Sequence, residues 1–190
     1  MFENVKDYLH VAKGIIPRTL CAQVVGQIES RDWRPHSWYQ YASDANKSEE
    51  TMELDVQDPS PGLQALLMPY CVQAATAYNA RFAFPRERTA QIMSKLSALR
   101  FNRYSPGQIM RQHQDHIHSL FDGTQKGIPV LSLVGNLNDD YEGAELYFWD
   151  DYVVPLGAGD ILIFPSLFMY PHGVKEATRG KRYSFVAWAW

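Results

Sequence analysis

The chain has 190 residues, of which 46% are hydrophobic and 21% are charged, and its formal net charge is −3. This length and composition are ordinary for a folded protein and exclude a largely disordered chain, so we expect a single domain over residues 1–190. The negative balance provides no general field that attracts phosphate backbones, and we therefore expect no nucleic-acid partner.

The N-terminal segment and the cysteines indicate the cellular compartment that we expect for the protein. Four charged residues interrupt residues 1–17, which therefore predict neither a signal peptide nor a membrane-spanning helix. We expect a cytoplasmic protein with no membrane partner. Cys21 and Cys71 have no short pair spacing, and we expect both to be buried free thiols. Any metal site would then need histidine and carboxylate ligands.

The first half of the chain predicts two helices. A short strand is expected within residues 8–16, followed by an amphipathic helix over 17–30 that begins at a proline. A second helix is expected over 62–82, with a kink at Pro69. Between them, the polar run SDANKSEE (43–50) predicts an exposed loop.

The second half predicts short strands bounded by turn residues. The expected strands lie within residues 92–104, 128–137, 144–149, 152–156, 160–165 and 182–190. Strands that follow helices favour an α+β fold, with the sheet closed or sandwiched so that its edges are hidden. We expect residues 1–90 to be mainly helical support, and residues 91–190 to form the β core with any metal site.

The segment RQHQDHIH (111–118) holds the strongest chemical signal. His113 and Asp115 are two residues apart, so on a strand both side chains would project from one face. A third ligand would have to come from a distant strand, and His172 follows the apolar run DILIFP. Two histidines and one carboxylate form the facial triad of non-haem Fe(II) sites. His116 and His118 are expected to be loop or substrate-side residues rather than ligands.

The last predicted strand carries a candidate anion site. Arg182 and Ser184 alternate with period two and so share one face of that strand. A guanidinium can bind a carboxylate through two hydrogen bonds, and a nearby hydroxyl adds a third donor. The pair predicts a seat for a dicarboxylate co-substrate.

With these residues in place, the chain resembles the 2-oxoglutarate- and Fe(II)-dependent dioxygenases, and within them the prolyl 4-hydroxylase-like branch. The resemblance is carried, between residues 102 and 188 and in this order, by the segments YSPGQIMRQHQD, GNLNDDYEGAELYFW, VPLGAGDILIFPS, HGV and RGKRYSFVAW. Two departures stand out. Gly143-Ala144 replaces the family's frequent Gly-Gly, and Asn136 replaces a frequent tyrosine in the inner wall of the pocket.

The resemblance implies a double-stranded β-helix, or jelly-roll, core backed by N-terminal helices. It implies that Fe(II) is bound by His113, Asp115 and His172, and that 2-oxoglutarate is bound by Arg182 with help from Ser184 and Tyr104. The implied activity is hydroxylation of a C–H bond by O2, most directly in a prolyl residue of a protein or peptide. Decarboxylation of 2-oxoglutarate to succinate and CO2 would accompany it. Binding of ascorbate as a reductant follows from the resemblance alone.

Other readings stay open. Free amino acids or other small molecules are alternative substrates. The run NRYSPGQIMRQHQD also resembles the Asn-x-Tyr and His-x-Asp pattern of AlkB-like nucleic-acid demethylases, but those enzymes have a second arginine six residues beyond the position of Arg182, where this chain has Trp188. A non-catalytic cupin-type barrel could bind a metal through the same residue types. It would have no need of the Arg182 and Ser184 pair.

Overall fold

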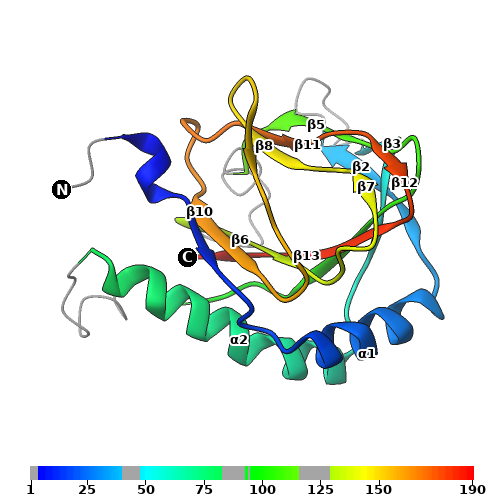
Figure 1. Cartoon of the computed structure of the whole chain (residues 1–190), viewed down its shortest axis with the longest axis horizontal. Helices are drawn as coiled ribbons and strands as arrows, with labels where there is room; N and C mark the ends of the chain where they lie inside the picture. Colours follow the sequence, from blue (N-terminus) through cyan, green and yellow to red (C-terminus); the bar gives the residue numbers. More distant parts are fainter. Residues whose placement is uncertain (1–3, 40–47, 83–92, 94, 116–128) are drawn as a thin grey trace.

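The computed structural model describes residues 4–39, 48–82, 93, 95–115 and 129–190. A short 3-10 helix, η1 (Val5–Tyr8), precedes the first strand. Two α-helices, α1 (Arg18–Glu29) and α2 (Pro61–Ala80), lie on the same side of a large sheet, and a smaller sheet covers its opposite side (Figure 1). Within the described residues, no helix is long and apolar enough to cross a membrane.

All strand pairs are antiparallel. The spatial order of the large sheet is β1 (His10–Ala12), β10 (Ile161–Pro165), β6 (Leu131–Asn136), β13 (Arg182–Ala189), β4 (Arg100–Tyr104), β3 (Ser48–Gln57) and β2 (Arg34–Tyr39). The small sheet has the order β5 (Met110–His113), β11 (His172–Val174), β8 (Leu146–Phe148) and β9 (Tyr152–Val154). A further pair is formed by β12 (Ala177–Arg179) and β7 (Glu142–Gly143). Two facing antiparallel sheets backed by helices give the expected jelly-roll architecture.

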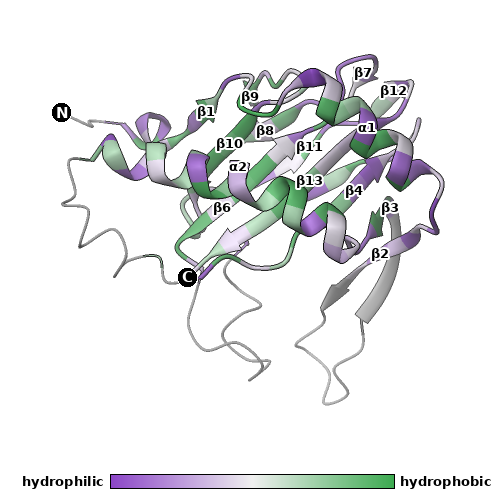
Figure 2. Ribbon diagram, turned by 90° about the horizontal axis from the view of Figure 1, so that it is seen from below, coloured by the Kyte–Doolittle hydropathy of each residue, from purple (hydrophilic) through white to green (hydrophobic). Residues whose placement is uncertain are grey.

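Alternating side chains divide the interior into two cores. On β10, Ile161 and Ile163 pack against the helices, whereas Leu162 and Phe164 point between the sheets. Figure 2, seen from the helix side, shows the apolar strands β10, β6 and β13 behind α1 and α2. Each fully buried aliphatic side chain contributes roughly 1.5–3 kcal/mol, so both cores stabilise the fold.

Strand β13 lies between β4 and β6, and its register decides which residues face the inter-sheet space. Tyr183 and Phe185 point to the helices. Arg182 and Ser184 therefore point to the other face, between the sheets. Gly135 on β6 is the register partner of Phe185, and a β-carbon at that glycine would lie 2.0 Å from the Phe185 ring. Glycine is thus required there for the aromatic ring to lie over β6.

The two helices bind the sheet through one apolar face each. Helix α1 buries Cys21, Val24 and Ile28. Helix α2 starts at Pro61, after Ser60 has capped it by accepting a hydrogen bond from the Leu63 amide, and it continues through Pro69. The predicted helices are confirmed. Both cysteines are free and buried, as expected, and burial raises the pKa of Cys71 to about 12.

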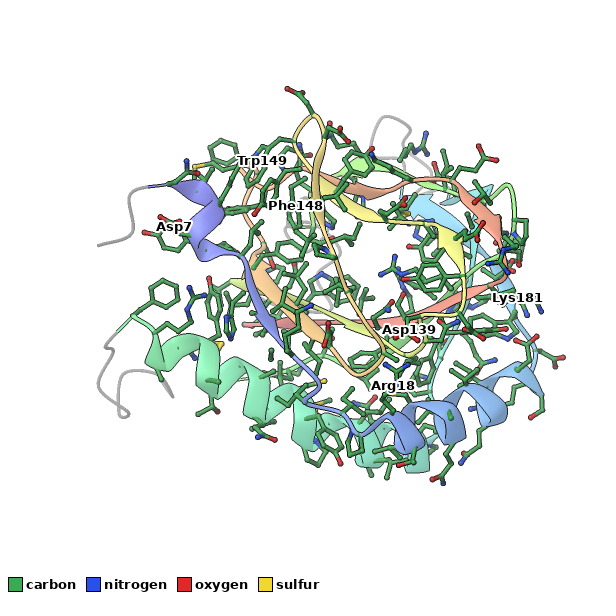
Figure 3. All side chains as sticks on the ribbon, in the orientation of Figure 1. Asp7, Arg18, Asp139, Phe148, Trp149 and Lys181 are labelled. Carbon is green, nitrogen blue, oxygen red and sulfur yellow. The ribbon has the colours of Figure 1, made fainter. Side chains whose placement is uncertain are left out.

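Polar contacts fix the two ends of α1. Arg18 donates two hydrogen bonds to Asp139, at 2.8 and 2.7 Å, and Lys181 donates one to Glu29 at 2.6 Å (Figure 3). Exposed ion pairs of this kind add little stability. They do hold α1 over the turns that lead into β7 and β13.

One expectation for the first half was wrong. The strand expected within residues 8–16 is β1, but β2 and β3 were not expected, and residues 48–50 of the predicted loop belong to β3 in the large sheet. The signal was period-two alternation, since Leu54 and Val56 are buried while Glu53 and Asp55, which alternate with them, are not. The rest of that loop, residues 43–47, lies outside the described residues.

Candidate active site

His113, Asp115 and His172 meet at the end of the small sheet. His113 ends β5, His172 begins β11, and the two residues are direct register partners. The Asp115 Oδ1 atom lies 3.5 Å from Nε2 of His113 and 3.8 Å from Nε2 of His172. One ligand atom from each residue lies within 4.8 Å of the others, so the three side chains could hold one metal ion.

The second nitrogen of each imidazole fixes its orientation. The Nδ1 atoms of His113 and His172 lie 3.0 Å from the carbonyl oxygens of Arg111 and Tyr170, respectively. A carbonyl only accepts, so both Nδ1 atoms carry the proton and both Nε2 atoms present a lone pair toward Asp115. This arrangement, in which the outer nitrogen is held and the inner one is free to coordinate, is usual for metal-binding histidines.

Asp115 is held ready as an anion. Its Oδ2 accepts a hydrogen bond of 2.5 Å from Ser132 on β6. Burial alone would raise the pKa of Asp115, but the neighbouring imidazoles of His172 and His113 and the Ser132 hydroxyl outweigh burial and hold this pKa well below its usual range. Burial also lowers the pKa of His172 to about 4. At neutral pH the site therefore offers an ionised carboxylate and a neutral imidazole.

Aromatic rings surround His172. Its ring centroid lies 5.5 Å from that of Phe148 on β8 and 4.8 Å from that of Phe164 on β10. Phe148 comes from the small sheet, and its neighbour Trp149 lies toward the surface beside it (Figure 3). This apolar wall leaves His172 only 5% exposed and restricts water on that side of the site.

Arg182 is buried without an acidic partner among the described residues. It is 1% exposed, its Nε donates to Asn136 Oδ1 at 3.0 Å, and its Nη1 donates to the carbonyl of Ala144 at 3.3 Å. Its guanidinium carbon lies 5.4 Å from the ring centroid of Tyr104, the register partner across β4. A buried cation held only by neutral groups is an incomplete ion pair that an anionic ligand would complete.

The triad and Arg182 open into the same cavity between the sheets. The residues that line it come from both sheets and are Arg100, Asn102, Tyr104, Met110, His113, Asp115, Leu133, Val134, Leu146, His172, Gly173, Val174, Arg182, Ser184, Val186 and Trp188. All six residues predicted to form the site are among them. His116 and His118 lie outside the described residues.

The structure also explains where the sequence patterns were incomplete. Asp115 is not on the strand with His113, as alternation suggested, but in the turn just beyond it. Asn136, the departure from the family's tyrosine, accepts the hydrogen bond from Arg182. Ala144 has a φ of +54°, a left-handed conformation that is costly for any residue with a β-carbon, which accounts for the glycine often found there in the family.

Sequence reasoning missed Ser132 and Arg100. Ser132 is 1% exposed and interrupts the apolar run of β6, and a buried polar residue within such a run is the signal that could have found it. Arg100 lies four residues before Tyr104 on β4, so period-two alternation places it on the same face.

The donor set fits Fe(II). Two neutral imidazole nitrogens and one carboxylate oxygen are the ligands of the facial triad, whereas zinc sites of the structural kind use four protein ligands and are often rich in cysteine. Among the described residues, these three side chains are the group of histidine, cysteine and acidic residues close enough to share an ion.

Comparison with known proteins gives matches in sequence and in structure. Residues 99–190 match the model of the 2OG-Fe(II) oxygenase superfamily, a segment that runs from β4 to the end of β13 and contains every predicted site residue. A PKHD-type hydroxylase of Psychrobacter sp. is 31% identical over 150 residues, which cover 76% of this chain and 54% of the relative. A PKHD-type hydroxylase of Burkholderia thailandensis is 27% identical over 95% of this chain and 76% of the relative. The chain thus spans only about half the length of the Psychrobacter relative.

Among solved structures, the viral collagen prolyl hydroxylase of Paramecium Bursaria Chlorella virus-1, in a 2OG complex, superposes with a TM-score of 0.69. The match covers 98% of both chains at 15% sequence identity. At this identity the likeness establishes the fold, the double-stranded β-helix.

Proposed function

We propose that this chain, which matches the model of the 2OG-Fe(II) oxygenase superfamily over residues 99–190, acts as a member of the prolyl 4-hydroxylase-like branch and hydroxylates a prolyl residue in a protein or peptide. Fe(II), 2-oxoglutarate and O2 supply the oxidising chemistry in this family, with succinate and CO2 as the other products. The protein's own part is to bind, to orient and to keep water out.

In this proposal His113, Asp115 and His172 hold the iron. The two Nδ1 hydrogen bonds keep both rings turned toward Asp115, and the Ser132 hydroxyl keeps the carboxylate turned toward the rings. Three protein ligands leave the remaining coordination positions for small molecules. That ligand number separates a catalytic site from a closed structural one.

The single observation that carries the proposal is the position of Arg182. A buried guanidinium without an acidic partner among the described residues faces the same cavity as the triad. A protein that only stored a metal would have no reason to bury this cation, whereas a dicarboxylate co-substrate would complete its ion pair. The Arg182 fork suits the carboxylate of 2-oxoglutarate that is farthest from the metal.

Ser184 and Tyr104 complete this seat. Ser184 is 1% exposed and lines the cavity on the same face of β13 as Arg182, so its hydroxyl can add a donor to the same carboxylate. The Tyr104 ring lies beside the guanidinium and limits its movement. Burial raises the pKa of Tyr104, so the phenol keeps its proton and can donate a hydrogen bond.

Apolar side chains in the walls of the cavity would limit the entry of water to the reacting centre. They come from β6, β8, β11 and β13 and are Leu133, Val134, Leu146, Val174 and Val186. Less water in the site would strengthen the contact of the co-substrate with Arg182 and would limit side reactions of the oxidising chemistry.

The proposal of a prolyl substrate is supported by the similar proteins found in the comparisons. The relatives are named hydroxylases, and the structural neighbour is named a collagen prolyl hydroxylase. The experiment that tests the proposal is incubation of the Fe(II)-loaded protein with 2-oxoglutarate, O2 and a panel of proline-containing peptides. We expect one peptide to gain the mass of a single oxygen atom, and we expect one molecule of succinate to form for each peptide molecule that gains it.

Two other arms separate the alternatives. Methylated oligonucleotides that lose a methyl group, with no change in any peptide, would replace the proposal with an AlkB-like demethylase. Iron binding without any formation of succinate would point to a cupin-type binding barrel.

His10→Ala is the matched control for alanine substitutions of the three proposed iron ligands. His10 lies on β1 and does not line the cavity, so its loss should not affect iron binding.

A further inference from the structure

The cavity contains a second arginine that the proposed chemistry does not use. Arg100 lies at the start of β4, on the same face as Asn102 and Tyr104, and lines the cavity with the triad. Its register partner on β13 is Val186, whereas that of Tyr104 is Arg182. The backbones of the two arginines are therefore four residues apart along the strand pair, roughly 13 Å, so they mark two ends of the inner face.

The recorded contacts of Arg100 are with neutral groups. Its Nε donates to Asn102 Oδ1 at 3.2 Å, and its guanidinium carbon lies 5.5 Å from the ring centroid of Trp188. No carboxylate among the described residues forms an ion pair with it. Arg103, three residues further along β4, shows the contrast, because it pairs with Asp55 at 2.8 Å.

Charged groups of both signs lie near Arg100, and its arginine neighbours already have carboxylate partners, Arg34 in Asp58 and Arg111 in Glu53. Burial lowers the pKa of Arg100, and the charge of Arg34 acts in the same direction, while Tyr104 and Asp115 oppose it. His36, a buried neighbour, has its pKa lowered to about 3 by burial and then by the positive charges of Arg100, Arg111 and Arg34. Among the described residues Arg100 alone of these three arginines has no carboxylate partner, so an anionic ligand in the cavity would complete its ion pair.

A guanidinium that lies beside an indole can still bind a carboxylate through its terminal nitrogens. The Trp188 ring and the hydrogen bond to Asn102 limit the movement of Arg100, and because that hydrogen bond uses Nε, the two terminal nitrogens are available to a ligand. The 2-oxoglutarate seat at Arg182 lies at the other end of the strand pair, so the ligand of Arg100 is a separate molecule.

We propose that Arg100 binds a carboxylate of the substrate, so that the preferred substrate carries a carboxylate within about one residue of the hydroxylated carbon. This inference rests on the proposed function, because it assumes that the cavity accepts a substrate beside 2-oxoglutarate. The carboxylate could belong to a free amino acid, to the C-terminus of a peptide or to an acidic residue next to proline. The three sources share one chemistry and are separated by the probes below.

The test compares matched acids and amides as ligands of the Fe(II)- and 2-oxoglutarate-loaded protein without O2, by calorimetry. The probe pairs are L-proline with L-prolinamide, acetyl-glycyl-proline with its amide, and acetyl-prolyl-aspartyl amide with its asparaginyl counterpart. In the wild type, we expect one acid to bind at least about tenfold more tightly than its partner, as for a charge-assisted contact. The pair that shows the preference identifies the source.

The variants assign that preference to Arg100. Arg100→Gln should reduce it to less than about twofold, and Arg100→Lys should keep an intermediate value because a point charge cannot replace the planar fork. Arg100→Met is a second neutral variant of similar length, should the glutamine variant fail to fold. Arg103→Gln is the matched control and should keep the full preference, since Arg103 does not line the cavity.

Three results would overturn the inference. The first is the absence of any acid preference in the wild type, including failure of all the probes to bind. The second is a preference that survives in both neutral variants of Arg100. If Arg100→Gln instead weakens 2-oxoglutarate binding about tenfold or more, Arg100 belongs to the co-substrate seat and the inference is also wrong. A wild type that binds no 2-oxoglutarate and forms no succinate would count against the proposed function itself.

Discussion

Ser132 on β6 donates a hydrogen bond of 2.5 Å to Oδ2 of Asp115, and the other oxygen of that carboxylate, Oδ1, is the one nearest both histidines. Ser132 is itself within 2.7 Å of the buried hydroxyl of Ser166. The hydrogen bond between Ser132 and Asp115 joins the large sheet, which carries the arginines, to the turn after β5, which carries the carboxylate. It therefore sets the position of the triad relative to Arg182.

Replacing Ser132 with alanine should weaken the metal site without unfolding the protein. The carboxylate loses the donor that orients it, and loss of such an outer contact typically costs about 10-fold to 100-fold in metal affinity. Titration of the protein with Fe(II) in the absence of O2 measures the change. Ser166→Ala is the control, since Ser166 touches Ser132 but has no recorded contact with Asp115, and its effect should be much smaller. Equal iron affinity in wild type and Ser132→Ala would show that the contact does not position the ligand.

Arg182→Ala should reduce the affinity for 2-oxoglutarate while leaving iron binding nearly unchanged. A hydrogen bond to a charged group contributes roughly 1.5–3 kcal/mol, so the apparent KM for 2-oxoglutarate should rise by on the order of tenfold to a hundredfold or more. Arg182→Lys should recover part of the loss. The affinity for 2-oxoglutarate can be measured directly from the absorbance band that appears when 2-oxoglutarate binds Fe(II). Equal affinities in all three proteins would place the co-substrate elsewhere.

Asp160 should stabilise the fold in a pH-dependent way. Its carboxylate accepts hydrogen bonds from Lys13 Nζ at 2.8 Å, from the Gly14 amide at 2.7 Å and from the Gly157 amide at 2.8 Å. Burial acts to raise the pKa of Asp160, but these donors outweigh burial and lower it below its usual value of 3.8. The stabilisation is thus fully present above about pH 4 and is lost as the pH falls through the lowered pKa of the folded state.

Asp160→Asn should therefore lower the free energy of unfolding at pH 7 by roughly 1.5–3 kcal/mol, and the gap from wild type should narrow below pH 4. Urea unfolding at pH 7, 5 and 3 measures this gap. Asp151→Asn is the control, because Asp151 is exposed and its ion pair with Lys175 should contribute little. A gap that is the same at pH 3 and pH 7 would mean that the charge of Asp160 does not stabilise the fold.

The sequence predicted most of the site because its signals are local. Period-two alternation on β13 put Arg182 and Ser184 on one face, and the spacing of His113 and Asp115 suggested shared coordination, although Asp115 reaches the site from a turn. What could not be predicted depends on register between distant strands. Tyr104 lies beside Arg182 because β13 pairs with β4 in this register. Ser132 reaches Asp115 because one sheet packs on the other.

The same distinction holds for the fold. The helices were evident from apolar periodicity, since Val24, Ile28, Leu63 and Leu67 repeat at helical spacing and are buried. Strand β3 was missed because polar residues mask its alternation. The role of Asn136 was likewise hidden, because an asparagine in an apolar strand reveals its partner only when β6 and β13 are placed side by side.

The most direct test of the central claim is the stoichiometry of Fe(II) binding, measured by equilibrium dialysis without O2, in the wild type and in His113→Ala, Asp115→Ala and His172→Ala. The three ligands act as one unit, so each single variant should lose nearly all tight binding while the wild type holds one iron per chain. His10→Ala should behave as the wild type, and circular dichroism should show that all the variants remain folded. One tightly bound iron in both His172→Ala and Asp115→Ala would contradict the account.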